Sequence, residues 1–200
     1  MSAPIIHVYL KTFPFLCDEE IIPESRKNLI NRCKSEKVRN EKYYAWKLLQ
    51  EAMYLTFSLN MKDVQFHKDR HGKWTCPDCY FSITHSNGVA AVVVANEPVG
   101  IDLEKVDLTR DYQKIASKAF LIVEKKDLTV DKFFKIWTIK EAYYKSLEKQ
   151  TRGFIPHDFN TIKIDHVLTK AIKIKDEKYY LSIVCEHTKD IKFQCELNNL

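Results

Sequence analysis

Residues 89–95, VAAVVVA, are the stretch that most constrains how this chain can fold. A run made only of valine and alanine is typical of a central strand that is buried in a sheet. The short turn Asn-Glu-Pro then separates it from a second largely apolar stretch, VGIDLEKV at 99–106. The short connection predicts that these two stretches form a β-hairpin.

The second stretch carries two carboxylates, Asp102 and Glu104, one residue apart. Alternate residues of a strand point to the same face, so these two side chains are expected to lie side by side. Two neighbouring carboxylates repel each other unless a cation lies between them, and Mg²⁺ prefers oxygen ligands. The pair therefore predicts either a metal site or the solvent-facing edge of a half-buried strand.

The rest of the chain alternates between strand and helix patterns. A strand is expected at 7–13, two helices within 24–59 with a break near 34–35, and an alternating strand at 80–84. A helix is expected at 111–120, a long amphipathic helix at 131–149, and a small antiparallel sheet over 161–196. This order predicts an α+β fold with two halves, 1–90 and 91–200.

The long helix contains the segment WTIKEAYYK at 137–145. Its helical spacing places Trp137, Lys140, Glu141, Tyr144 and Lys145 on one face. An acid, two lysines and an indole on one face favour a binding site, because a solvated face has little use for tryptophan. The alternative is a solvated face with ion pairs between neighbouring turns.

Two further segments could contact phosphate. In FSITHSNG at 81–88, His85 is flanked by hydroxyl residues, and backbone N–H groups of the following turn could also donate to an anion. In HGKW at 71–74, Gly72 can adopt a positive φ, and Lys73 follows it. Taken singly, each segment could equally be ordinary surface.

Composition limits the class of protein. The chain has 200 residues, 45% of them hydrophobic, and a net charge of +5, which suits a globular protein with an anionic ligand or an acidic partner. It has no stretch that resembles a secretory signal or a membrane span, so a cytoplasmic protein with reduced thiols is expected. CPDC at 76–79 has the spacing of half a zinc site but no second ligand pair follows, which favours a simple turn.

Together, FSITHSNG, VGIDLE and FFKIWTIKEAYYK resemble the phosphopantetheinyl transferases in order and spacing, over roughly residues 70–160. The resemblance is to the longer, monomeric type that activates surfactin synthetase and related carrier proteins. It implies a pseudo-twofold arrangement of two similar α/β halves with coenzyme A between them. It also implies Mg²⁺-dependent transfer of the 4′-phosphopantetheine arm to a serine of an apo acyl or peptidyl carrier protein, with release of adenosine 3′,5′-bisphosphate.

The resemblance also assigns roles to residues. It makes 1–90 the half that contacts the phosphates of coenzyme A and 91–200 the half with the metal site and catalytic helix. The implied metal ligands are Asp102, Glu104 and Glu141, and the implied catalytic residues are Glu141 and Lys145. The implied coenzyme A contacts are Arg39, Gly72, Lys73, Thr84, His85, Lys140 and Lys145, with Arg26 and Arg32 as competitors for the place of Arg39.

Three alternatives remain open: a degenerate relative that binds coenzyme A without transfer, a metal-dependent nuclease, and a basic nucleic-acid-binding module. A nuclease site usually places its lysine two residues after an acid on a paired strand, whereas Lys140 precedes Glu141 on a predicted helix. We expect a monomer whose partners are coenzyme A and a carrier protein, with no nucleic acid or membrane partner.

Overall fold

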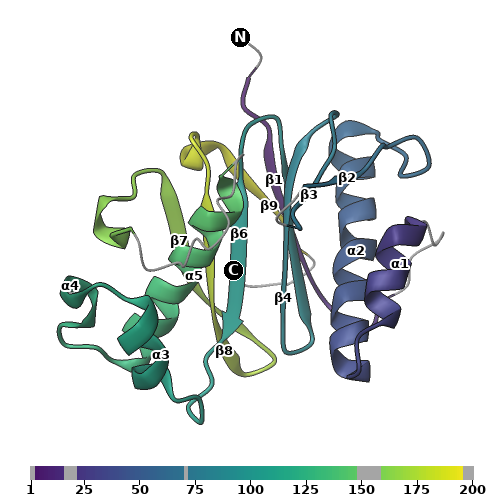
Figure 1. Cartoon of the computed structure of the whole chain (residues 1–200). Coiled ribbons are helices and arrows are strands. Elements are labelled where there is room, and N and C mark those ends of the chain that lie inside the picture. Colours follow the sequence, from purple (N-terminus) through teal and green to yellow (C-terminus); the bar gives the residue numbers. More distant parts are fainter. Residues whose placement is uncertain (1–2, 16–21, 70–71, 148–158, 196–200) are drawn as a thin grey trace.

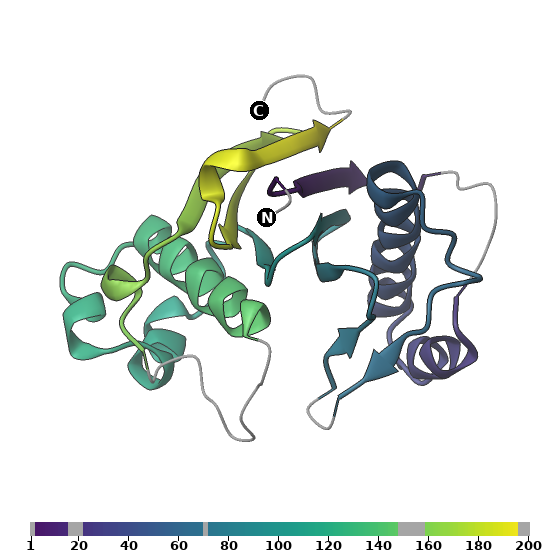
Figure 2. The ribbon, with the colours of Figure 1, turned by 90° about the horizontal axis from the view of Figure 1, so that it is seen from above.

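The computed structural model describes residues 3–15, 22–69, 72–147 and 159–195. It confirms the mixed α+β class: two sheets lie next to each other, each covered by one long helix (Figure 1). Helix α2 (Glu36–Phe57) packs on the first sheet and α5 (Val130–Ser146) on the second. Seen from above, these helices lie on opposite sides of the molecule with strands between them (Figure 2).

The first half begins with β1 (Ile6–Thr12), α1 (Glu24–Asn31) and α2. The break between the helices falls where predicted, and the Ser35 hydroxyl caps α2 by accepting the Val38 N–H. The half ends with the small pair β2 (His67–Lys68) and β3 (Trp74–Thr75) and the hairpin of β4 (Tyr80–Ser86) and β5 (Val89–Ala95). The order of its sheet is β4-β5-β1-β9, with β9 (Ile191–Cys195) parallel to β1.

The second half repeats this plan. It runs through β6 (Gly100–Lys105), α3 (Tyr112–Ala119), α4 (Ile122–Lys125), α5, a 3₁₀ turn at Thr161–Lys163, and the hairpin of β7 (Val167–Ile174) and β8 (Glu177–Val184). A second 3₁₀ turn at Thr188–Asp190 leads to β9. In both halves a strand precedes the long helix, and the second strand of the later hairpin pairs with that first strand. This shared topology confirms the pseudo-twofold arrangement.

Strand β5 is buried on both faces, as its composition predicts. Val89, Ala91, Val93 and Ala95 face the core shared with β6 and β8, while the alternate residues face α2. None of the described helices is both long and apolar enough to span a membrane. The boundary between residues 90 and 91 lies within β5 and stays a prediction.

The predicted hairpin of 89–95 with 99–106 is wrong. Strand β5 already has β4 and β1 on its two edges, so β6 turns away and pairs with β8 in the other sheet. The prediction for 161–196 is only partly right, because β7 and β8 are antiparallel partners but β9 joins β1.

Strands β4 and β6 are nevertheless linked, through hydroxyl groups. Backbone N–H groups of Ile101, Leu103 and Lys105 donate to the side-chain oxygens of Ser82, Thr84 and Ser86, at 3.1, 3.3 and 3.0 Å. Alternate β4 residues supply these acceptors. The backbone N–H groups on the edge of β6 that faces away from β8 therefore have hydrogen-bond partners, although none of the described strands pairs with that edge. This row of hydroxyls joins the two halves where the predicted site residues lie.

Candidate active site

The site begins with the close approach of β6 to α5. A Cβ atom built on Gly100 would lie 1.9 Å from the Ala142 carbonyl oxygen and 2.5 Å from the Ser146 N atom. Only a residue without a side chain allows this contact between backbones. The contact brings the acids of β6 beside the charged residues of α5.

We expect Gly100→Ala to lower the free energy of unfolding by about 3 kcal/mol, because its methyl group would push α5 away from β6. Chemical denaturation measures this loss. Gly88→Ala is the matched control: its added Cβ meets nothing within 4 Å, although its φ of +87° disfavours alanine. We expect a cost of only about 1 kcal/mol there. Equal costs for the two variants would show that the contact with α5 does not constrain β6.

Asp102 lies at the centre of the site and is 5% exposed. Its Oδ1 accepts hydrogen bonds from the Lys145 ammonium group at 2.7 Å and from the Thr84 hydroxyl at 3.1 Å. Its Oδ2 is buried without a hydrogen-bond partner. A buried carboxylate oxygen with no partner is costly, so this atom is a candidate ligand for a cation.

The negative charge of Asp102 acts on both Glu104 and Glu141. Burial, together with the Asp102 charge, raises the pKa of Glu104 to about 7. The same two causes raise the pKa of Glu141. Glu104 is also held by Arg110, at 3.7 Å, and by a hydrogen bond with the Trp137 side chain. Among the described residues, the ligand atoms of Asp102, Glu104 and Glu141 do not all lie within 4.8 Å of one another. Their charges nevertheless interact, and a hard divalent cation would relieve that repulsion.

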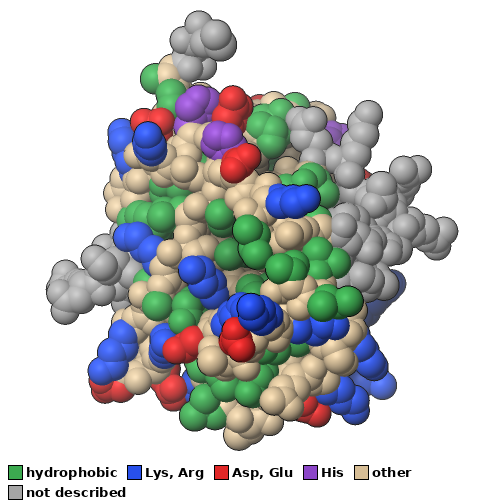
Figure 3. All heavy atoms as spheres, turned by 90° about the vertical axis from the view of Figure 1, so that its left-hand side faces the viewer, with side chains coloured by type: hydrophobic (Ala, Val, Ile, Leu, Met, Phe, Trp, Pro, Cys, Tyr) green, Lys and Arg blue, Asp and Glu red, His purple; other side chains and the backbone are tan. Residues whose placement is uncertain are grey.

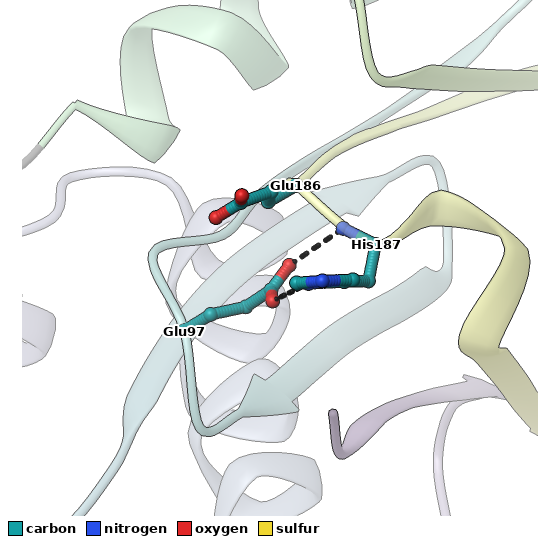
Figure 4. A group of neighbouring side chains, drawn as sticks. All are labelled: Glu97, Glu186 and His187. Atoms are coloured by element: carbon teal, nitrogen blue, oxygen red, sulfur yellow. Dashed lines mark hydrogen bonds and ion pairs between the residues drawn. The ribbon is translucent and has the colours of Figure 1, made fainter. Parts of the chain in front are cut away.

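A different cluster is the tighter one. Within the described residues, the set of three acidic or histidine side chains whose ligand atoms lie within 4.8 Å of one another is Glu97, Glu186 and His187. Figure 4 shows that both Glu97 oxygens face His187; they bind its backbone N–H and its ring. Through these hydrogen bonds, Glu97 connects the β5–β6 turn to the segment after β8. None of the three lines either cavity described below.

A cavity of about 390 Å³ is lined in part by Lys145, the ion-pair partner of Asp102. We call it the basic cavity; its walls include Arg26, Lys42, Gly72, Lys73, Trp74, His85, Tyr144 and Lys145. A second cavity of about 510 Å³, here the mixed-charge cavity, is lined by residues that include Glu41, His85, Glu104 and Arg110. His85 belongs to both, so the two cavities meet at that side chain.

The basic cavity suits an anion. Burial and the charges of Lys145, Lys42 and Arg26 lower the pKa of His85 to about 4, so its ring is neutral near pH 7. Lys73 donates to the carbonyl oxygens of Lys145 and Leu147, both at 2.8 Å, and so holds a cation at the C-terminal end of α5. The Nε atom of Arg26 is buried without a hydrogen-bond partner.

The structure brings most of the predicted residues together. Gly72, Lys73, His85 and Lys145 line the basic cavity, and Gly72 has the expected positive φ. Thr84 is buried, does not line this cavity, and donates its hydroxyl hydrogen bond to Asp102.

Other predicted residues do not line the basic cavity. Lys140 is fully buried and paired at 3.0 Å with the buried Glu124, and it does not line the basic cavity. Arg39 and Arg32 do not line it either, whereas Arg26 does.

The sequence prediction missed Lys42 and Arg110. Lys42 lies on α2 among many other charged residues, and no motif distinguishes it. Arg110 follows β6 by a few residues and stacks near the Trp137 ring at 5.4 Å. The unexplained indole on the charged helix face was the signal that could have indicated such a partner.

Comparison with known proteins shows to which family a chain with these residues belongs. A model of the 4′-phosphopantetheinyl transferase superfamily matches residues 98–196, which include β6 and α5 with all three carboxylates. The chain belongs to this superfamily. Membership agrees with the shared topology of the two halves and with the order of the motifs.

Curated relatives within the superfamily are similar at modest identity. The 4′-phosphopantetheinyl transferase gsp of Aneurinibacillus migulanus is 28% identical over 137 residues, which cover 66% of this chain and 56% of the relative. The 4′-phosphopantetheinyl transferase Sfp of Bacillus subtilis strain 168 is 26% identical over 139 residues, which cover 64% and 60%. The chain thus spans somewhat more than half the length of these relatives.

Proposed function

We propose that the chain transfers the 4′-phosphopantetheine arm of coenzyme A to a serine of an apo carrier protein and releases adenosine 3′,5′-bisphosphate. One observation carries this proposal: Asp102, with its unpartnered oxygen, is paired with Lys145, and Lys145 lines a cavity whose walls are basic. Coenzyme A needs both features, because its pyrophosphate and ribose phosphate are anionic and its reacting phosphate must be neutralised. Superfamily membership supports the same activity.

The basic cavity would hold the nucleotide end of coenzyme A. Arg26, Lys42 and Lys73 are the cations that could contact its phosphates, and charge-assisted hydrogen bonds of this kind are the strong ones. His85, neutral before binding, could donate a further hydrogen bond from its ring. Lys145 lies between this cavity and Asp102, where it would stabilise charge on the leaving phosphate.

Asp102, Glu104 and Glu141 would hold Mg²⁺. When bound, the ion would supply charge neutralisation at the pyrophosphate. The chain's own groups position the reactants: Arg110 and Trp137 fix Glu104, and Thr84 fixes Asp102. Glu141 is our candidate to accept the proton of the attacking serine hydroxyl, with Glu104 as the second candidate. Burial and the charge of Asp102 raise the pKa of both carboxylates, which makes each a stronger base than an exposed glutamate.

The carrier protein would dock on the face that α3, α4 and β7 form. Hydrophobic and basic side chains are interspersed there (Figure 3). Ile122 and Val123 of α4 are 86% and 49% exposed, and Lys114, Lys118 and Lys126 nearby in sequence are exposed as well. Such a surface suits an acidic amphipathic helix. We place this reaction in the cytoplasm and expect the enzyme to act as a monomer.

Replacing Arg26 with alanine should raise the KM for coenzyme A by about 10-fold or more, because a charge-assisted contact is worth about 1.5–3 kcal/mol. Steady-state kinetics with varied coenzyme A measures the change. Arg39→Ala is the matched control and should leave KM unchanged, since Arg39 does not line the basic cavity. A larger rise in KM for Arg39→Ala than for Arg26→Ala would indicate that Arg39 contacts coenzyme A instead.

The transfer itself is tested with coenzyme A that carries a fluorescent group on its thiol. Purified protein, Mg²⁺ and an apo fatty-acid carrier or an apo peptidyl carrier are mixed in parallel, and labelled carrier is read on a gel. We expect labelling of at least one carrier. Binding of coenzyme A without labelling of several carriers would support a degenerate relative instead. Salt-sensitive binding of nucleic acid in place of coenzyme A would support the nucleic-acid-binding module.

A further inference from the structure

Two cysteines outside the proposed site face each other. Cys76 and Cys79 lie in the turn between β3 and β4, and their sulfur atoms are 3.9 Å apart. The Cys76 thiol also contacts the Cys79 carbonyl oxygen at 3.3 Å. A disulfide needs about 2.05 Å between sulfurs, so the two sulfur atoms must move closer by about 2 Å to form the bond.

The two thiols differ in environment, as the two members of a reactive pair do. Cys76 is half-buried and lines a cavity of about 190 Å³ together with Trp74 and Phe81. Cys79 lines the same cavity but is only 7% exposed. The hydrogen bond with the Cys79 thiol lowers the pKa of Cys76 to about 7, while that bond and burial raise the pKa of Cys79. Cys76 is therefore the nucleophile and Cys79 the thiol that resolves the intermediate.

The pair does not have the ligands of a metal site. Within the part of the chain that the structure describes, no third histidine, cysteine or acidic side chain joins Cys76 and Cys79 in a potential metal cluster. A closed structural zinc site needs four ligands. Redox chemistry between the two sulfurs explains their arrangement better.

We propose that Cys76 and Cys79 are a redox-active thiol pair that small-molecule disulfides, such as oxidised glutathione, convert reversibly into an intramolecular disulfide. The Cys76 thiolate attacks one sulfur of oxidised glutathione, which breaks the glutathione S–S bond and releases one glutathione thiolate. Cys79 then gives up its proton and attacks the Cys76 sulfur, which releases the second glutathione. The protein loses two electrons and two protons, and two molecules of reduced glutathione result.

The pair would form this disulfide whether or not the chain transfers phosphopantetheine. Its cavity nevertheless shares Lys73, Trp74 and Phe81 with the basic cavity, so the oxidised turn borders the proposed coenzyme A site.

The test equilibrates the full chain with a series of ratios of reduced to oxidised glutathione, quenches with acid, alkylates free thiols and maps peptides by mass spectrometry. We expect the wild type to lose alkylation at two cysteines and to yield a linked Cys76–Cys79 peptide. The fraction linked should follow the glutathione ratio and return to zero with dithiothreitol. Cys33→Ser, which removes a half-buried cysteine elsewhere, should behave as the wild type.

Two variants separate the steps. Cys79→Ser should accumulate glutathione on Cys76, because the resolving thiol is gone. Cys76→Ser should form neither the disulfide nor a glutathione adduct at Cys79. The proposal is overturned if both thiols stay alkylatable throughout the series, if glutathione remains on Cys76 of the wild type, or if either cysteine links to a different one.

Discussion

Replacing Asp102 with asparagine should lower the rate of phosphopantetheine transfer by more than about 100-fold, the scale on which loss of a metal ligand or of a preorganised charge acts. Asparagine keeps the shape of the side chain but removes the charge that pairs with Lys145 and would hold Mg²⁺. The fold should survive, because the amide oxygen of asparagine can still accept the hydrogen bonds of Lys145 and Thr84. Transfer rates at saturating coenzyme A, together with circular dichroism, measure both effects.

Glu186→Gln is the matched control for this change. It removes the exposed Glu186 carboxylate of the Glu97–Glu186–His187 cluster, which lines neither cavity, and should leave the rate unchanged. A wild-type rate for Asp102→Asn at the same Mg²⁺ concentration would show that Asp102 is no metal ligand.

The second large effect concerns stability. Lys140→Met should lower the free energy of unfolding by about 3–5 kcal/mol, because it leaves the buried Glu124 carboxylate without its cation. Both side chains of this ion pair are completely buried. Glu124 also accepts the Leu121 N–H at 2.8 Å and the Thr161 N–H at 2.9 Å, so it cannot turn to solvent without losing these bonds. Urea denaturation measures the loss.

Two further variants make this result specific. Lys135→Met, at an exposed position of the same helix, should change stability by less than about 0.5 kcal/mol. Adding Glu124→Gln to Lys140→Met should recover much of the loss, since the neutral amide oxygen still accepts the Thr161 N–H. Unchanged stability of Lys140→Met with weakened coenzyme A binding would instead make Lys140 the ligand contact that the family resemblance implies.

Local patterns predicted the elements of this fold well. The valine and alanine run is a central strand because nothing polar interrupts it, and Ser35 marks the start of α2 because its hydroxyl can cap the helix. The pairing of strands was not predictable in the same way. Two apolar stretches joined by a short turn look like a hairpin, and only the filled edges of β5 exclude that pairing.

The candidate site was likewise predictable only in part from local patterns. Alternation placed Asp102 and Glu104 on one face, and the helix motif supplied Glu141 and Lys145. The position of Lys140 depends on Glu124 of α4, a partner that no spacing rule reveals. Arg26 rather than Arg39 lines the basic cavity because of how α1 packs beside α2, which is decided by tertiary contacts.

The most direct measurement of the proposed activity is intact-mass spectrometry of an apo carrier protein after incubation with coenzyme A and this protein. We expect the carrier to gain one phosphopantetheine arm and an equal amount of adenosine 3′,5′-bisphosphate to appear. Both should require Mg²⁺ and the acceptor serine. A carrier mass that stays unchanged across fatty-acid and peptidyl carriers, while coenzyme A binds, would contradict the proposed activity.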